Sequence, residues 1–266
     1  MGASDELLAV AVSVAREAAD LALRSRPSAI TDVDTKSSKT DVVTAADVAV
    51  EQLVRARLGE LRPGEPVFGE ETGGAAAAPG QVCWVVDPID GTVNYLYGYP
   101  WYAVSLAAQV DGVSVAAAVV EPASGREWTA VRGGGSWLDG VPLRVSDATR
   151  LDLSLVATGF AYRVERRGRQ AAGVSRLLPK VRDIRRGGAA SLDLCAVAAG
   201  WVDGYFEHGL SRWDWAGGTL IAEEAGAVVR YPDTDDDLDP EFTFCATPGI
   251  AKELREALID ANLTGL

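Results

Sequence analysis

The sequence predicts a layered α/β fold in which helices cover sheets. Three observations support it: a helical apolar period at the start, short apolar runs with a hairpin signal in the middle, and alternating strand and helix patterns in the second half. The chain has 266 residues, of which 48% are hydrophobic and 24% are charged. This balance is typical of globular proteins, and the length allows a sizeable buried core.

The first half predicts two helices followed by a meander of strands. Apolar residues at helical spacing predict an amphipathic helix over residues 5–25. A second helix is expected from Thr44 to about Arg62, because Thr44 and Asp47 have the spacing of a capping box. The apolar run Val82–Val86 is too short for a helix and predicts a buried strand.

An antiparallel sheet is expected to continue from that strand. Two apolar runs, residues 103–110 and 113–120, are joined by Asp111-Gly112, a strong hairpin signal. Residues 127–131 and 141–145 flank a glycine-rich turn and are expected to extend the same sheet.

In the second half, strand and helix patterns alternate, which predicts a second α/β unit. The expected strands are 153–157, 182–186, 203–207, 227–231 and 242–245, and the expected helices are 165–179, 189–199, 214–225 and 248–261. A boundary near residues 146–152 would divide the chain into an N-terminal part, 1–146, and a C-terminal part, 147–266.

The net charge of the chain limits the classes of partner that it can bind. Twenty-five basic and 38 acidic residues give a net charge of −13. With that charge and no basic run, direct binding to nucleic acid or to an anionic membrane is not expected. No segment has the ~20 apolar residues that span a bilayer, and Asp5 and Glu6 stand where a signal peptide needs positive charge. We therefore expect a cytoplasmic protein.

Cysteine and histidine content limits the kinds of site. The three cysteines, Cys83, Cys195 and Cys245, are far apart in apolar stretches, which favours buried reduced thiols over a disulfide framework. His208 is the only histidine, so a histidine-rich metal site is excluded. The sequence assigns His208 no chemistry.

Carboxylates at the edges of predicted elements are the candidate site. Glu70 and Glu71 are adjacent between glycines, an awkward placement unless a cation or water lies between them. Asp87 falls at the end of a buried strand, where a charge costs several kcal/mol unless it is paired or metal-bound. Asp90 is expected to return a second carboxylate to the same side.

Other groups are expected to complete the site. Gly91 and Thr92 follow Asp90 and would present free amides at the start of a turn or helix, which suits an anion. Asp214 is expected to be the N-cap of its helix, and Asp47 lies in a first helical turn. All ligand candidates are oxygen donors, which select magnesium, manganese or calcium. Beside an anion site, they suit metal-assisted phosphoryl chemistry.

Four motifs carry a family resemblance. They read WVVDPIDGTVNY, WDWAGGTLIAEEAGA, GEETGG and KSSKTDVVTAAD. With them the sequence resembles the inositol monophosphatase family from about residue 5 to 262. The resemblance implies an αβαβα sandwich, commonly dimeric, with two or three Mg²⁺ ions in each active site.

The resemblance also implies roles for individual residues. The first magnesium would be held by Glu70, Asp87 and the Ile89 carbonyl, and the second by Asp87, Asp90 and Asp214. Glu70 would help to hold a third ion through waters. The amides of Gly91 and Thr92 would hold the phosphate, and Asp47 and Thr92 would polarise the attacking water, which Glu70 also orients. Asp90, Gly188, Ala190, Glu207 and Asp214 would contact the substrate, and Lys36 would lie on a mobile loop.

The expected activity is magnesium-dependent, lithium-sensitive hydrolysis of myo-inositol 1-phosphate or a close polyol phosphate. A carboxylate at Glu207 suits a ring hydroxyl and would repel a second phosphate, which favours monophosphates of neutral polyols. Histidinol phosphate or fructose 1,6-bisphosphate are alternative substrates on the same scaffold. An additional non-enzymatic role, binding the transcription machinery, is the alternative from another class of function.

Overall fold

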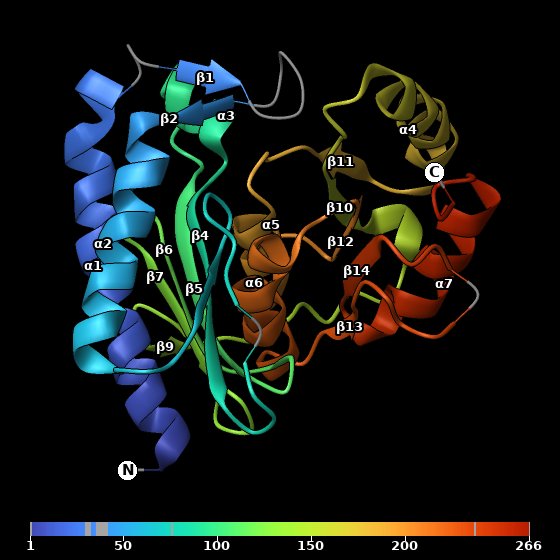
Figure 1. Cartoon of the computed structure of the whole chain (residues 1–266). Coiled ribbons are helices and arrows are strands. Elements are labelled where there is room, and N and C mark those ends of the chain that lie inside the picture. Colours follow the sequence, from blue (N-terminus) through green and yellow to red (C-terminus); the bar gives the residue numbers. More distant parts are fainter. Residues whose placement is uncertain (1, 30–32, 36–41, 76, 237, 266) are drawn as a thin grey trace.

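The computed structural model describes residues 2–29, 33–35, 42–75, 77–236 and 238–265. Figure 1 shows five layers: two helices, a sheet, two central helices, a second sheet, and two outer helices. The layered α/β class and the αβαβα sandwich implied by the resemblance are confirmed. Among the described residues, no helix combines the length and apolar character that crossing a membrane requires.

The first two layers are a helix pair and a seven-stranded sheet. The helices are α1 (Ala3–Ala29) and α2 (Ala45–Leu61). In spatial order, the sheet contains β3 (Val67–Gly69), β4 (Val82–Asp90), β5 (Ala103–Val110), β6 (Val113–Val120), β7 (Glu127–Val131), β8 (Gly135–Leu138) and β9 (Val141–Pro142). The pair β3–β4 is parallel and the other pairs are antiparallel. A separate ribbon joins β1 (Val33–Thr35) to β2 (Val42–Thr44).

Both faces of the first sheet are buried, as its apolar runs require. On β4, Trp84 and Val86 pack with α1 and α2, whereas Cys83 and Val85 belong to the central cluster with two helices of the second half, α5 (Ala190–Ala198) and α6 (Arg212–Glu224). This alternation follows from the two-residue period of a strand. A continuous apolar run therefore fills two cores at once.

The remaining layers come from the second half. The central helices are α5 (Ala190–Ala198) and α6 (Arg212–Glu224). The second sheet has the order β11 (Asp183–Arg185), β10 (Leu155–Thr158), β12 (Gly204–His208), β14 (Phe242–Ala246) and β13 (Val228–Arg230). Its outer face carries α4 (Val164–Leu177) and α7 (Pro248–Asp260), and short 3₁₀ turns lie at Leu151–Leu153 and Leu178–Lys180.

Two local predictions need correction, and a third is made more specific. Strand β4 does not end at Val86 but continues through Pro88 to Asp90, because an irregularity in register between Asp87 and Asp90 accommodates the proline. The predicted strand 141–145 is only two residues long, and β8 precedes it. A six-residue helix, α3 (Thr92–Tyr97), follows Gly91, where a turn or helix was expected.

Candidate active site

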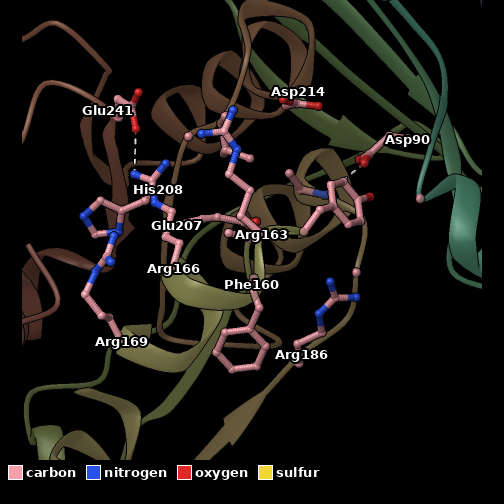
Figure 2. Close-up of a pocket in the computed structure, with 18 of the residues that line it drawn as sticks. Asp90, Phe160, Arg163, Arg166, Arg169, Arg186, Glu207, His208, Asp214 and Glu241 are labelled. Atoms are coloured by element: carbon pink, nitrogen blue, oxygen red, sulfur yellow. Dashed lines mark hydrogen bonds and ion pairs between the residues drawn. The ribbon is translucent and has the colours of Figure 1, made fainter. Parts of the chain in front are cut away.

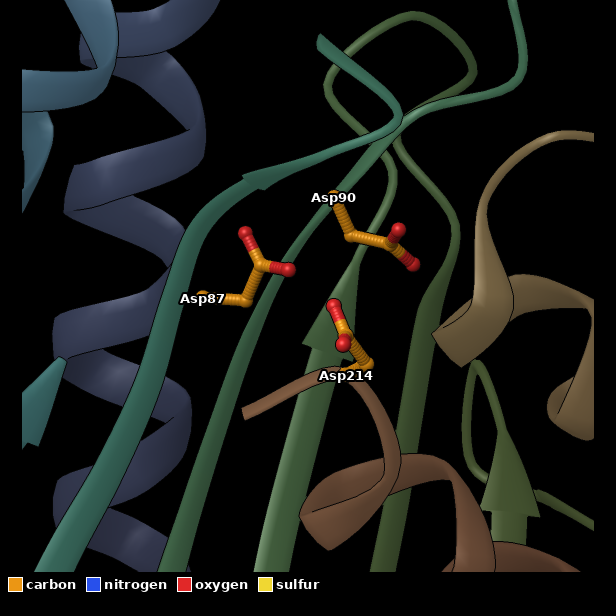
Figure 3. A group of neighbouring side chains, drawn as sticks. All are labelled: Asp87, Asp90 and Asp214. Atoms are coloured by element: carbon orange, nitrogen blue, oxygen red, sulfur yellow. The ribbon is translucent and has the colours of Figure 1, made fainter. Parts of the chain in front are cut away.

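Three aspartates meet where the first sheet faces α6. Asp87 and Asp90 come from the end of β4, and Asp214 comes from the first turn of α6. Their carboxylates offer ligand atoms that all lie within 4.8 Å of one another, and Figure 3 shows the three side chains as close neighbours. We call these three residues the acidic floor. The structure thus brings together the three aspartates that the resemblance assigns to one metal ion.

Backbone amides fix the first two carboxylates. Asp87 Oδ1 accepts a hydrogen bond of 3.0 Å from the Ile89 amide. Asp90 accepts bonds from the amides of Ala190 and Ser191, at 3.1 and 2.7 Å, and from the Ser191 hydroxyl. The start of α5 therefore orients a carboxylate carried by β4, as the dipole of a helix N-terminus favours.

Asp214 is held differently from the prediction. It was expected to be the N-cap of α6, but the N-cap is Ser211, and Asp214 is the third residue of the helix. Its Oδ2 accepts a 2.6 Å hydrogen bond from the Ser211 amide, which completes a capping box. One oxygen thus secures the helix end while the other remains available to a ligand.

The acidic floor is electrostatically strained without a cation. Burial, then the charges of Glu70, Asp90, Asp214 and Asp47, raise the pKa of Asp87 well above its usual value. Burial, then Asp90 and Glu70, raise the pKa of Asp214 in the same way. A hard divalent cation would relieve this repulsion, and the oxygen-only donors suit Mg²⁺, Mn²⁺ or Ca²⁺. The residues therefore fit the metal that the resemblance implies.

A buried ion pair on α2 fixes the loop that carries Glu70. Glu51, fully buried, accepts hydrogen bonds from the Glu71 amide at 2.7 Å and from the Thr72 amide at 3.2 Å. Arg55, one turn later, binds Glu51 at 2.9 Å and donates to the carbonyls of Val67 and Gly73. The sequence analysis missed this pair, although its i,i+4 spacing was visible.

Asp47 and Thr92 lie together as expected. Asp47 is fully buried at the third position of α2, where its Oδ2 accepts from the amide and hydroxyl of Thr44. The predicted capping box is confirmed. The Thr92 hydroxyl lies 3.2 Å from Asp47 Oδ1 and 3.2 Å from the Ile89 carbonyl, so it can donate to either. Gly91 adopts φ 89°, a left-handed conformation that suits glycine.

A cavity of about 660 Å³ opens beside the floor. Asp90, Gly91, Gly188, Ala190, Glu207 and Asp214 all line it, which brings Gly91 together with the predicted substrate residues; Thr92 is not among the lining residues. Glu207 accepts a 2.7 Å hydrogen bond from the Tyr205 hydroxyl, and burial raises its pKa to about 7. At neutral pH this carboxyl is therefore partly protonated, which weakens the expected repulsion of a second phosphate. Lys36 lies outside the described residues.

Arginines that the sequence analysis overlooked form the opposite side of this cavity. Figure 2 shows Arg163, Arg166 and Arg169 across from Asp90 and Asp214, with Arg186 beside Gly188. Arg166 pairs with Glu241 at 2.6 Å. His208, almost fully buried at the same side, packs 4.7 Å from the Phe242 ring. The signal for this feature was the density of basic residues over 163–186, which no single run displays.

Comparisons with known proteins agree with the motifs. A sequence model of the inositol monophosphatase family matches residues 3–262. The inositol-1-monophosphatase of Mycobacterium leprae is 48% identical, over 96% of this chain and 94% of that relative. A protein of Escherichia coli K12 named Nus factor SuhB is 37% identical, over 84% of each chain. The solved structure of Mycobacterium tuberculosis SuhB has 42% identity and a TM-score of 0.82, over 96% of each chain.

Proposed function

The chain belongs to the inositol monophosphatase family, and from that premise we propose that it is a magnesium-dependent phosphatase of polyol phosphates such as inositol 1-phosphate. The observation that carries the proposal is the acidic floor beside a cavity that holds the glycine turn and Glu207. The name Nus factor belongs to a relative, whereas the carboxylate set of this chain supports catalysis.

We assign the roles as follows. Glu70, Asp87, the Ile89 carbonyl, Asp90 and Asp214 would hold the metal ions, which when bound neutralise the ester and activate water. The amides of Gly91 and Thr92 would bind the phosphate, because the first amides of α3 have no acceptor within the helix. The Thr92 hydroxyl, held by Asp47, would orient the attacking water together with Glu70.

On the substrate side, Glu207 would accept a hydrogen bond from a ring hydroxyl. Gly188 and Ala190 would allow the ring to approach, because they present little or no side chain. Gly159 leaves room for the Glu207 carboxyl: a Cβ at this position would lie 1.8 Å from Glu207 Oε2, so any other residue would displace the carboxyl.

A phosphate-release assay over several sugar and polyol phosphates tests the proposal. We expect turnover with magnesium, negligible activity in excess chelator, rescue by added magnesium, and inhibition by calcium and by millimolar lithium. Calcium is larger and accepts loose coordination, so it should misplace the attacking water. Undiminished turnover in chelator would contradict the proposal.

A further inference from the structure

We propose that Arg163, Arg166, Arg169 and Arg186, which we call the arginine wall, bind a second anionic group of the substrate. The substrate class would be a polyol or sugar phosphate that carries another phosphate or carboxylate beyond its ring. This inference rests on the proposed phosphatase function and specifies its substrate further. It departs from the preference for neutral polyols that Glu207 alone suggested.

The distribution of charge along the chain is the first observation. Residues 163–186 contain nine basic and two acidic side chains, a net charge of +7. The rest of the chain therefore carries −20. In so acidic a protein, one basic segment beside the cavity would attract an anion locally, because cavity walls of low dielectric focus the field.

The individual side chains are available to a ligand. Arg163, Arg169 and Arg186 are exposed at the cavity, and their side chains form no ion pair with any described residue. The charge of Arg186 nevertheless acts on the carboxylates of Asp90 and Glu207: burial raises their pKa values, and Arg186 lowers them. Arg166 is engaged by Glu241, and Glu165 and Glu207 are the other acids on this side. A guanidinium presents its donors in a planar fork that matches phosphate or carboxylate, so Arg163 and Arg169 in particular are suited to this task.

The geometry separates the two anionic groups. The reacting phosphate belongs beside Gly91 and the acidic floor. Figure 2 places Arg166 and Arg169 on the far side of Glu207 from Asp90, with Arg163 beside Glu207. A cavity of about 660 Å³ falls in the range that holds drug-sized ligands, so a ring with a group at each end fits. Glu207 would then face the ring between them.

The test compares fructose 1-phosphate with fructose 1,6-bisphosphate, which differ by one phosphate. We expect the wild-type protein to have the higher kcat/KM on the bisphosphate. In the Arg163→Gln/Arg169→Gln variant, the ratio of the two kcat/KM values should fall at least tenfold, mainly through KM. The Arg163→Lys/Arg169→Lys variant should recover part of it, because the charge remains. Arg24→Gln/Arg144→Gln removes the same charge outside the cavity and should leave the ratio unchanged.

A second experiment separates this inference from the proposed function. Binding of the two esters is measured by calorimetry with calcium in place of magnesium, so that no turnover is expected. If turnover fails but the bisphosphate binds more tightly through the two arginines, the phosphatase proposal is wrong and the arginine wall stands. An equal loss on both esters, or a binding ratio that the glutamine variant does not move, would overturn the arginine wall. The arginine wall would also be overturned if the glutamine variant lost binding to single-stranded RNA while its ratio of kcat/KM values for the two esters stayed at the wild-type level. That result would assign the wall to nucleic acid.

Discussion

The acidic floor and the arginine wall face the same cavity but are built by opposite means. Each floor carboxylate is anchored to a backbone amide of a sheet or helix end, and Asp87 and Asp90 are buried. The wall consists of long side chains at the N-cap and first turns of α4 and in the segment before α5, three of them exposed. The difference indicates that reaction chemistry depends on fixed groups, while substrate discrimination is left to side chains that adapt.

Removing a floor ligand should have the largest effect. Asp214→Asn should lower turnover at least ~100-fold and leave the fold intact, because an amide oxygen can still accept from Ser211 but binds magnesium poorly. A phosphate-release assay measures the change in turnover, and thermal unfolding measures the change in stability. Asp147→Asn, at an exposed position, is the control. Retained activity with early unfolding would reduce Asp214 to a helix-capping residue.

Weakening the support of the floor should have an intermediate effect. Glu51→Gln keeps the shape but removes the charge that binds the Glu71 and Thr72 amides, so the loop with Glu70 should loosen. We expect the magnesium concentration for half-maximal activity to rise about tenfold and stability to fall by ~1–3 kcal/mol. Magnesium calorimetry provides a second readout, and Glu60→Gln on the same helix is the control. Unchanged magnesium affinity would show that Glu51 stabilises the fold only.

Glu207 lies between the two regions and should have a smaller effect. Glu207→Gln should weaken discrimination among polyols by roughly 1–3 kcal/mol, the range for a charge-assisted hydrogen bond. Phosphate release from a generic small ester should hardly change. Because its pKa is about 7, discrimination by the wild-type protein should strengthen as the pH rises through 7, and the variant should lose this dependence. An equal loss on every ester would disprove the role.

His208, beneath the arginine wall, should affect stability alone. Burial, then Arg166, lowers its pKa to about 4 in the folded protein, although Asp239, Glu241 and the Thr264 backbone oppose the shift. The neutral form is therefore favoured by folding. This stability is present above the unfolded pKa of 6.5 and is lost as the pH falls toward 4.

As the pH falls from 6.5 toward 4, we expect the free energy of unfolding to decrease by roughly 1–3 kcal/mol more in the wild-type protein than in His208→Gln. The imidazole resonances of this single histidine report the pKa directly by NMR. A midpoint near 6.5 in the folded protein would contradict the expected burial effect.

The floor was predictable from sequence because its residues lie within short motifs. Asp87 and Asp90 are three residues apart, so one strand end determines both positions. The mistaken N-cap at Asp214 arose because an acid suits either the cap or the third position, and only the backbone shows that Ser211 takes the cap. The arginine wall needs α4 to reach the cavity beside the end of β4, a long-range arrangement that no local period encodes. The contact of Glu51 with the Glu70 loop was missed for the same reason, since the Glu71 and Thr72 amides lie 20 and 21 residues away, whereas its pairing with Arg55 was visible in the i,i+4 spacing.

The floor also has a consequence for the order of assembly during synthesis. Asp87 and Asp90 leave the ribosome long before Asp214, whose helix α6 packs between the two sheets. Until α6 has emerged and docked, the nascent chain lacks one carboxylate of the floor. A cation held by all three carboxylates would therefore bind only once this last central helix has docked, and it would selectively stabilise chains that have reached that stage.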